Sequence, residues 1–388
     1  MTHAIPVDTL YYTTIVSRDA KATARQHAEF YGITKWNVAR LTPDRLTKTS
    51  IRGRGPGRAA NEGLYGNTPP GGEFGFLMAT GRHPNEGIEF QIIESLSGMS
   101  TFEHFLATRG MGVHSVFMSV VEPSEFPALR NWLGSENIPI AQSFTIDGVA
   151  DFYYFDTRKA LGGFYIQVVV PVRADWEKAM PQDERWDFSG ELKNAAAGEP
   201  PRNTSAIVHY GVIVHDLDAH LPNFAKLFNQ PIWRGMNWRT APGSLEDTTC
   251  NGKPVVHSYF TGRADVGKTR NGTNFGFEVV QPTFGPSHYK EDFLLQLGPG
   301  IHHLDLNFKV KDWDEWDALN NWLADDFQSP TCMSGWLRGR SALFQYQDAR
   351  KSLGYVVEIH APPPATSTAP KVRWAPDYWY DFGVPAQA

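Results

Sequence analysis

The chain has 388 residues, which is more than one ordinary domain core holds and suits two domains. It is 41% hydrophobic and 20% charged, as folded globular proteins are, and this composition excludes a largely disordered chain. The formal net charge is −6 and Lys and Arg form no long stripe, so we expect no nucleic-acid partner. No run of roughly 18 apolar residues is present, so we expect no membrane-spanning helix.

Cysteine usage and the N-terminal residues bear on the compartment. The first residues lack a basic segment followed by an apolar stretch, so we expect no secretory signal. Cys250 and Cys332 are far apart in the sequence, which argues against a disulfide framework and against a thiolate zinc site. A cytoplasmic location is therefore expected.

The chain contains an internal repeat. Three pairs of similar segments occur in the same order, with the members of each pair roughly 190 residues apart. The pairs are FLATRGMGVH (105–114) with FLLQLGPGIH (293–302), EFPALRNWL (125–133) with EWDALNNWL (315–323), and DTRKALG (156–162) with DARKSLG (348–354). We infer a tandem duplication.

The second half shows the plan of each repeat most clearly. Alternating and helical spacing of apolar residues predicts the following elements in chain order: strand 209–214, helix 216–228, strands 255–260 and 275–280, then strand 303–308, helix 313–323 and strands 341–346 and 355–359. One strand, one helix and further strands, twice in each half, predict an α+β fold of four βαβββ modules. We expect domains at 1–172 and 207–363 and a polar linker at 173–206. The Pro- and aromatic-rich tail at 364–388 is expected to form either a surface strap or a lid.

Four predicted strands of the second half sort the candidate metal ligands. In each strand the apolar residues occupy one face, and one His or Glu points to the opposite face. These four residues are His209, Glu278, His303 and Glu358. If the sheet curls towards that face, the four side chains converge, and two imidazoles with two carboxylates suit a divalent first-row metal. Glu278 is either the fourth ligand or a carboxylate that orients His209 from outside the coordination shell.

These motifs resemble the vicinal oxygen chelate superfamily, which includes glyoxalase I, methylmalonyl-CoA epimerase and extradiol dioxygenases. The resemblance covers residues 8 to 363 apart from the linker, and rests on HYGVIVHDLD, FEVVQP, GPGIHHLDLNF and LGYVVEI. It implies that the four modules pair into two curled-sheet domains. It also implies one divalent metal ion (Fe, Mn, Ni, Co or Zn) on His209, Glu278, His303 and Glu358, in the ligand order of bacterial-type glyoxalase I.

The first half does not carry the same ligands. Its corresponding positions are Tyr12, Gln91, Ser115 and Gln167, so we expect its metal site to be lost. An inert first half followed by a metal-binding second half resembles extradiol dioxygenases and 4-hydroxyphenylpyruvate dioxygenase, which use a His-His-Glu triad on Fe(II). The extradiol signature is broken, however: Arg338 and Arg340 stand where a His is expected.

Three functions remain open at this stage. In the first, the metal chelates an oxygenated, aromatic small molecule, and Glu358 or Glu278 moves a proton through a metal-bound enediolate, as in a glyoxalase-type lyase or isomerase. The second is an Fe(II)-dependent ring-cleaving dioxygenase, and the third is a metal-free small-molecule-binding protein. The fourth carboxylate favours the first. The duplication could replace a dimer within one chain, and it leaves room for a homo-oligomer.

Other polar residues near these motifs have weaker signals. His360 shares a face with Glu358 and is a candidate acid or base. His302 lies on the apolar face of its strand and is expected to be a buried structural histidine, unlike His303. Arg338 and Arg340 either pair with an anionic substrate group or lie in a solvated loop. The aromatic residues Trp336, Tyr346, Trp374, Tyr378 and Trp379 are candidate pocket walls.

Overall fold

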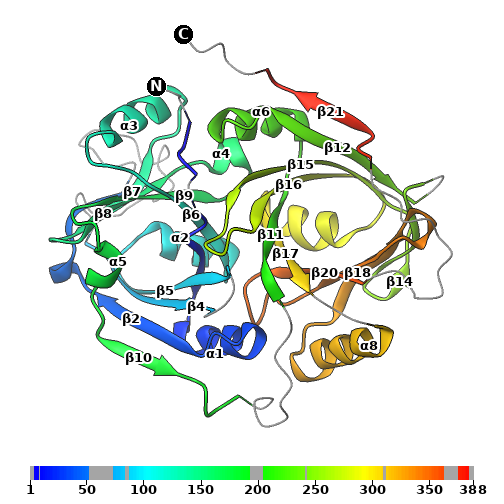
Figure 1. Ribbon diagram of the computed structural model, residues 1–388, viewed down its shortest axis with the longest axis horizontal. Coiled ribbons are helices and arrows are strands. Elements are labelled where there is room, and N and C mark those ends of the chain that lie inside the picture. The colour runs from blue at the N-terminus through cyan, green and yellow to red at the C-terminus, as the bar shows by residue number, and fades with distance from the viewer. Residues whose placement is uncertain are drawn as a thin grey trace. The chain divides into compact units, whose positions relative to one another are not determined.

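A computed structural model describes the protein over residues 4–7, 9–51, 73–83, 87–192, 204–240, 243–308, 312–361 and 375–383. The chain divides into two compact units, one built mainly from residues before position 200 and the other mainly from residues after it. Each unit combines a large curled sheet with short helices, so the α+β prediction is confirmed (Figure 1). Within the described ranges, no helix has both the length and the apolar character needed to cross a bilayer.

The first unit is built around a ten-stranded sheet in the order β10-β2-β4-β5-β1-β6-β9-β8-β7-β3. Its elements are β1 (Tyr12–Ser17), α1 (Ala20–Tyr31), β2 (Lys35–Leu41), β3 (Thr47–Ile51), β4 (Gly75–Arg82), β5 (Glu89–Ser97), α2 (Thr101–Arg109), β6 (Gly112–Val120), α3 (Phe126–Ser135), β7 (Ile140–Ile146), β8 (Ala150–Phe155), α4 (Arg158–Leu161), β9 (Tyr165–Pro171), α5 (Trp176–Ala179) and β10 (Glu184–Asp187).

The second unit is built around an eleven-stranded sheet in the order β14-β13-β18-β19-β20-β17-β11-β16-β15-β12-β21. Its elements are β11 (Thr204–Ile213), α6 (Leu217–Leu227), β12 (Ile232–Arg239), β13 (Leu245–Cys250), β14 (Lys253–Pro254), β15 (Ser258–Lys268), β16 (Asn274–Phe284), the π-helix η3 (His288–Leu294), α7 (Leu295–Leu297), β17 (Gly300–Phe308), α8 (Trp313–Asn321), the π-helix η4 (Trp322–Asp326), β18 (Thr331–Leu337), β19 (Leu343–Gln347), β20 (Val356–Ala361) and β21 (Tyr378–Asp381).

The predicted modules are present in both units. In the second unit they are β11-α6-β12-β15-β16 and β17-α8-β18-β19-β20. The two modules join through antiparallel pairing of their first strands, β11 with β17, and β1 pairs with β6 in the same way in the first unit. The last strand of each module runs parallel to its first strand, as β16 does to β11 and β20 to β17. This arrangement places the first and last strands of both modules side by side in the middle of each sheet.

Two segments that we predicted to lie outside the domains form edge strands. β10 lies within the expected linker and pairs with β2, and β21 lies within the tail and pairs with β12. Asp183 Oδ2 accepts a hydrogen bond from the backbone N–H of Arg40 at 2.7 Å, and Asp377 Oδ2 accepts one from that of Asn237 at 2.8 Å. The expectation of a linker is therefore wrong for residues 184–187. An edge strand is solvated along one side, which gives it the polar composition we took for a linker.

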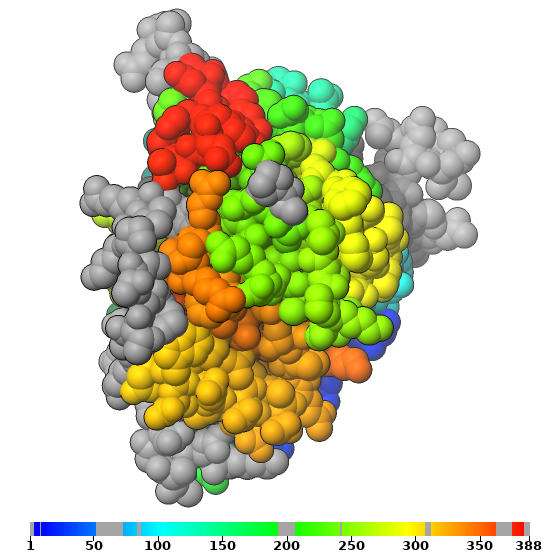
Figure 2. Space-filling model, turned by 90° about the vertical axis from the view of Figure 1, so that its right-hand side faces the viewer, coloured from blue at the N-terminus to red at the C-terminus, as the bar shows by residue number. Residues whose placement is uncertain are grey.

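The tail strand is a strap along the edge of the second sheet. Figure 2 shows β21, in red, at the surface of the second unit. The tail residues at 362–374 and 384–388, including Trp374, lie outside the described part of the chain. β10 and β21 thus occupy equivalent places in their two sheets, each pairing with the second strand of a first module.

The concave side of the second sheet is only partly filled by hydrocarbon. The helical segment 288–297, yellow in Figure 1, is enclosed by the sheet and contributes Tyr289, Phe293 and Leu294 to a buried cluster with strand residues. On the outer side, α6 packs on β15 and β16 through Leu221 and Phe224, both fully buried. The apolar faces of the strands thus pack against helix on the outer side of the sheet. Polar residues face the concave space that remains.

Candidate metal centre

Four neighbouring strands in the middle of the second sheet each supply one ligand-type side chain. The strand order β20-β17-β11-β16 contributes Glu358, His303, His209 and Glu278 in turn. One donor atom from each residue lies within 4.8 Å of one from each of the others. The structure therefore brings together the four residues that strand alternation selected. Because adjacent strands lie about 4.8 Å apart, convergence of four side chains requires the curl of the sheet.

The donor atoms surround a common point. His209 Nε2 and His303 Nε2 lie 3.4 Å apart, and each is 3.2 Å from Oε2 of Glu358. Oε2 of Glu278 is slightly farther, at 3.5 Å from His209 and 3.7 Å from His303. The side chains of His209, His303 and Glu358 are 2%, 0% and 6% exposed, whereas that of Glu278 is 12% exposed. Glu278 is thus the most accessible member of the cluster.

A further set of residues holds these side chains in place. Asp305 Oδ2 lies 3.0 Å from His209 Nδ1, the ring nitrogen that faces away from the cluster. His303 Nδ1 is likewise 3.0 Å from Nδ1 of His302. The hydroxyl of Tyr346 donates a 2.7 Å hydrogen bond to Oε1 of Glu358. Such contacts fix the tautomer and the orientation of metal ligands.

Electrostatics favour a divalent cation at this point. Burial and Arg263 lower the pKa of His209, but Asp305 and Glu278 raise it, and the pKa lies well above its usual value. Burial also lowers the pKa of His303, but neighbouring carboxylates raise it above normal. The reverse holds for Glu278: burial raises its pKa, and hydrogen bonds to both imidazoles lower it to about 2. The carboxylates thus favour positive charge at the two imidazoles, and they would favour a cation at the same point.

The donor set fits a metal ion. A divalent cation carries the same charge as the two imidazole protons that it would replace. Oε2 of Glu358 is buried, has no hydrogen-bond partner among the described residues, and points into the cluster. No other group of three or more such side chains with comparable geometry occurs in the part of the chain that the structure describes.

Three of the four cluster residues, His209, Glu278 and Glu358, line a cavity of about 190 Å³. Arg234 and Arg263 both line it, and they are paired across β12 and β15. Nε of Arg263 is buried and has no hydrogen-bond partner among the described residues. Aromatic and apolar side chains complete the lining, among them Trp238, Tyr259, Phe344 and Pro376 of the tail. The cavity thus offers positive charge and aromatic surface next to the cluster.

Three sequence predictions about flanking residues have definite outcomes. His302 is fully buried outside the cluster, with Nε2 at 2.8 Å from Nδ1 of His288, as expected for a structural histidine. His360 lines the cavity, and its Nε2 lies 3.4 Å from Oε1 of Glu358. Arg338 and Arg340 are exposed and do not line the cavity, and Arg340 pairs with Asp247.

Sequence reasoning missed the roles of Asp305, Arg234 and Arg263. Asp305 was recognisable in one respect, because it lies two residues after His303 on the same strand face. The two arginines carried no comparable signal, because their strands pair only in the folded sheet. Tyr346, a proposed pocket wall, does line the cavity, whereas Trp336, Tyr378 and Trp379 do not.

The first unit has the same register without the ligands. Thr14 pairs with Gln91 as Gly211 pairs with Glu278. Phe117 is the register partner of Gln167 in the first unit, and Asp305 is the register partner of Glu358 in the second. Phe117 therefore corresponds to Asp305, and Gln167 to Glu358. The positions equivalent to the cluster are therefore Tyr12, Gln91, Ser115 and Gln167, the same residues that the repeat indicated.

Comparison with solved structures identifies the fold. A mutant of 4-hydroxymandelate synthase from Streptomyces coelicolor superposes with a TM-score of 0.51 at 12% identity, over 94% of this chain and 95% of that one. The chain has the vicinal oxygen chelate fold. Two further solved structures match with lower scores: a halotolerant catechol dioxygenase (TM-score 0.41, 10% identity, 95% of this chain and 91% of that one) and the Mn(II)-bound glyoxalase from Novosphingobium aromaticivorans (TM-score 0.40, 10% identity, 92% and 82%).

The four cluster residues lie on the first and last strands of paired modules, and these strands are neighbours in the curled sheet. No protein-family model matches the sequence, and no curated protein matches it. At these identities the similarity concerns the fold alone, so the function has to be argued from the cluster and its cavity.

Proposed function

We propose that the second unit is a divalent-metal-dependent enzyme that catalyses proton transfer on a small, oxygenated, anionic molecule, as a lyase or isomerase of the glyoxalase type. The observation that carries the proposal is the convergence of two imidazoles and two carboxylates at one buried point beside a cavity. His209, His303, Glu358 and Glu278 would hold Fe, Mn, Co, Ni or Zn. When bound, such an ion supplies a Lewis acid for two neighbouring oxygen atoms of the substrate.

Within this cluster, Glu278 is the residue best placed to move the proton. It lines the cavity and is the most exposed of the four. Glu358 also reaches the cavity, but its Oε1 accepts the hydrogen bond of Tyr346 and its Oε2 faces both imidazoles. Glu358 is therefore held as a ligand, whereas Glu278 can take a proton from a carbon atom in the cavity and return it.

His360 is assigned the second proton-transfer role. Its side chain is 38% exposed, and it lies between Oδ1 of Asp305 at 3.5 Å and Oε1 of Glu358 at 3.4 Å. It thus connects the cavity to solvent on the Glu358 side. A proton taken up by Glu278 and one delivered by His360 would reach the substrate from different sides, which suits an isomerisation or an elimination.

Arg234 and Arg263 define the substrate class. The two arginines are register partners on neighbouring strands. Their guanidinium groups suit a carboxylate, because each presents a planar fork of donors. The buried and unpaired Nε of Arg263 indicates that a ligand completes its hydrogen bonding. The aromatic lining favours a planar body between this anionic end and the cluster.

A second candidate function is supported by the position of Glu278. Its Oε2 is farther from the imidazole nitrogens than Oε2 of Glu358 is, at 3.5 and 3.7 Å against 3.2 Å. If Glu278 stays outside the coordination shell, His209, His303 and Glu358 form the two-histidine, one-carboxylate set that suits Fe(II) and oxygen chemistry. An extradiol-type ring-cleaving dioxygenase is therefore the alternative.

One variant separates the two functions. After chelation, the wild type and Glu278→Gln are loaded with Fe(II), Mn, Co, Ni or Zn, and bound metal is measured by elemental analysis. Incorporation of deuterium from D₂O into (R)-mandelate and into the hemithioacetal of methylglyoxal and glutathione reports proton transfer. Catechol-dependent O₂ uptake reports ring cleavage.

The proposed function predicts that Glu278→Gln retains metal but loses deuterium exchange by about a hundredfold or more. A protein that takes up O₂ with catechol, and does so equally well as Glu278→Gln, is a dioxygenase instead. A protein that holds none of these metals at micromolar concentration is a binding protein, and the enzyme assignment fails.

A further inference from the structure

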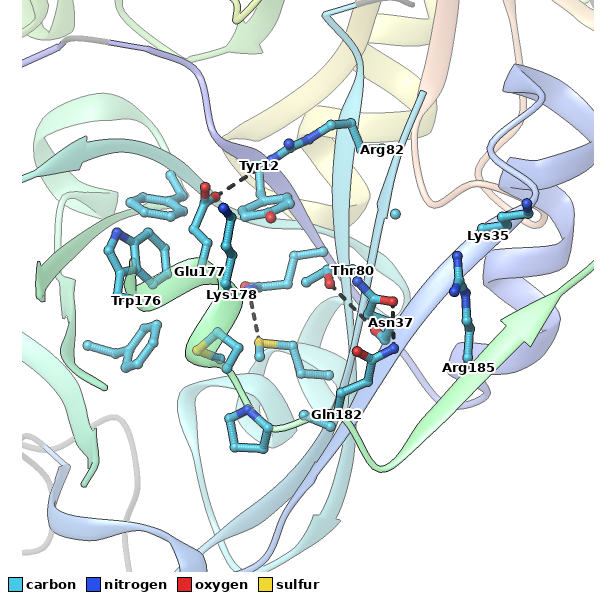
Figure 3. Close-up of a pocket in the computed structure, with 18 of the residues that line it drawn as sticks. Tyr12, Lys35, Asn37, Thr80, Arg82, Trp176, Glu177, Lys178, Gln182 and Arg185 are labelled. Carbon is cyan, nitrogen blue, oxygen red and sulfur yellow. Dashed lines mark hydrogen bonds and ion pairs between the residues drawn. The ribbon is translucent and has the colours of Figure 1, made fainter. Parts of the chain in front are cut away.

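The first unit contains a cavity of its own, larger than that of the metal centre. It has a volume of about 550 Å³, within the range of small-molecule sites, and it is shown in Figure 3. Three of its lining residues, Tyr12, Gln91 and Gln167, stand at positions equivalent to metal-cluster residues of the second unit. The duplication has thus kept a cavity where the ligands for a metal are missing.

The cavity is lined by two amide donors, one with only a weak acceptor and one with no acceptor among the described residues. The hydroxyl of Thr14 lies 3.2 Å from Oε1 of Gln91 and 3.5 Å from Oε1 of Gln167, so both amide oxygens face it. Nε2 of Gln91 contacts only the sulfur of Met78, a weak acceptor, at 3.0 Å. Gln167 is fully buried, and its Nε2 has no partner among the described residues. A ligand oxygen would satisfy these donors.

One side of the cavity is aromatic. Trp176 is 7% exposed, and its ring centroid lies 5.9 Å from that of Phe117 and 6.2 Å from that of Phe152. Tyr12 lies 6.0 Å from Phe117 on the neighbouring strand. All four rings line the cavity, and Figure 3 shows Trp176 and Tyr12 on the same side of it. Such a wall suits a planar apolar group.

The opening of the cavity is positively charged. Lys35, Arg82, Lys178 and Arg185 line it, against the single carboxylate of Glu177. Arg82 is paired with Glu89 at 2.8 Å. It is also paired with Glu177 at 3.7 Å, as Figure 3 shows. The other three cations have no ion-pair partner among the described residues. Exposed carboxylates outside the lining partly offset this charge, since Asp187 interacts electrostatically with Lys35 and Arg185, and Asp175 with Lys178. Four cations against one carboxylate in the lining still favour an anionic ligand.

We propose that this cavity is a second, metal-independent binding site for a small aromatic carboxylate. The amides of Gln91 and Gln167 donate to ligand oxygen, Trp176 packs on the ring, and Lys178 and Arg185 compensate the charge. No imidazole lines the cavity among the described residues, and its one carboxylate is paired with Arg82. The site therefore binds its ligand without transforming it, and it does not depend on the function of the second unit.

The test uses the full-length, chelated protein with 4-bromobenzoate as the probe. In crystals grown with the probe, anomalous scattering from bromine is expected beside Trp176 in the first unit. In solution, isothermal titration calorimetry is expected to show binding that weakens about tenfold in Arg185→Ala and in Gln167→Leu. Arg130→Ala, which removes an exposed guanidinium from α3, is the matched control and keeps wild-type affinity.

Several results would overturn the proposal. Bromine found only in the cavity of the second unit, or equal binding of the neutral 4-bromobenzamide, would do so. Wild-type affinity in both Arg185→Ala and Lys178→Ala would have the same consequence. If Gln167→Leu lowers the unfolding temperature, the two variants at the cavity opening decide the matter alone, because Arg185 and Lys178 are both exposed.

Discussion

Replacing Gly211 by alanine tests the geometry of the proposed metal centre. Gly211 lies on β11 and is the register partner of His303 on β17. A Cβ atom at position 211 would lie 1.8 Å from Cε1 and 2.0 Å from Nε2 of His303, whereas ordinary contact begins at 3.4 Å. The imidazole would have to retreat by well over an ångström, several times the ~0.2 Å that a metal–ligand distance tolerates.

The imidazole of His303 has no room to make this movement. The residue is fully buried, and the ring centroids of Tyr346 and Tyr289 lie 5.0 and 6.0 Å from its own. We therefore expect Gly211→Ala to weaken metal binding by about a hundredfold or more. Crowding should also lower the free energy of unfolding of the metal-free protein by about 1–3 kcal/mol.

Metal affinity is measured by competition with a chromophoric chelator for Co(II) or Zn(II), and stability by urea unfolding of the chelated protein. Gly262→Ala is the matched control, because a Cβ atom there would lie 2.7 Å from the side chain of Leu221 on α6, away from the cluster. It should lose stability but keep metal affinity. The reasoning is refuted if Gly211→Ala binds metal like the wild type, or if both variants lose affinity equally.

Three other predictions concern the surroundings of the cluster. His303→Ala should lose the metal. His302→Ala removes the hydrogen bond to His288 and the contact with the outer ring nitrogen of His303, so it should mainly lose stability and retain the metal at reduced affinity. Equal metal retention in the two variants would contradict this distinction. Asp305→Asn should weaken metal affinity by about 10- to 100-fold in the same chelator assay, and an unchanged affinity would show that Asp305 does not orient His209. The pKa values of His209 and His303 are raised, and a metal binds only the neutral rings. Metal affinity should therefore increase with pH above 6.5, and binding should release protons. A metal affinity that stays constant from pH 6 to 9 would contradict the assignment.

The sequence by itself determined the duplication, the four modules and the identity of the cluster. Each of these follows from short-range patterns in the sequence. The patterns are the repeated segments and the alternation that places His303 and His302 on opposite faces of one strand. Alternation is a property of a single strand, so the face on which a side chain lies can be predicted without knowing which strands are its neighbours. Alternation does not reveal β10, because an edge strand can pair without an apolar face of its own, and its residues were therefore predicted as a linker.

Only the tertiary structure decided what surrounds the cluster. The pairing of Arg234 with Arg263, and the contact of Asp305 with His209, depend on which strands become neighbours and in which register. Register also explains why position 211 is glycine: the ring of His303 occupies the space of its side chain. At the equivalent pair of the first unit, Thr14 faces Ser115, and no imidazole has to be accommodated. Contacts of this kind join strands that are distant in sequence, so no local sequence pattern predicts them.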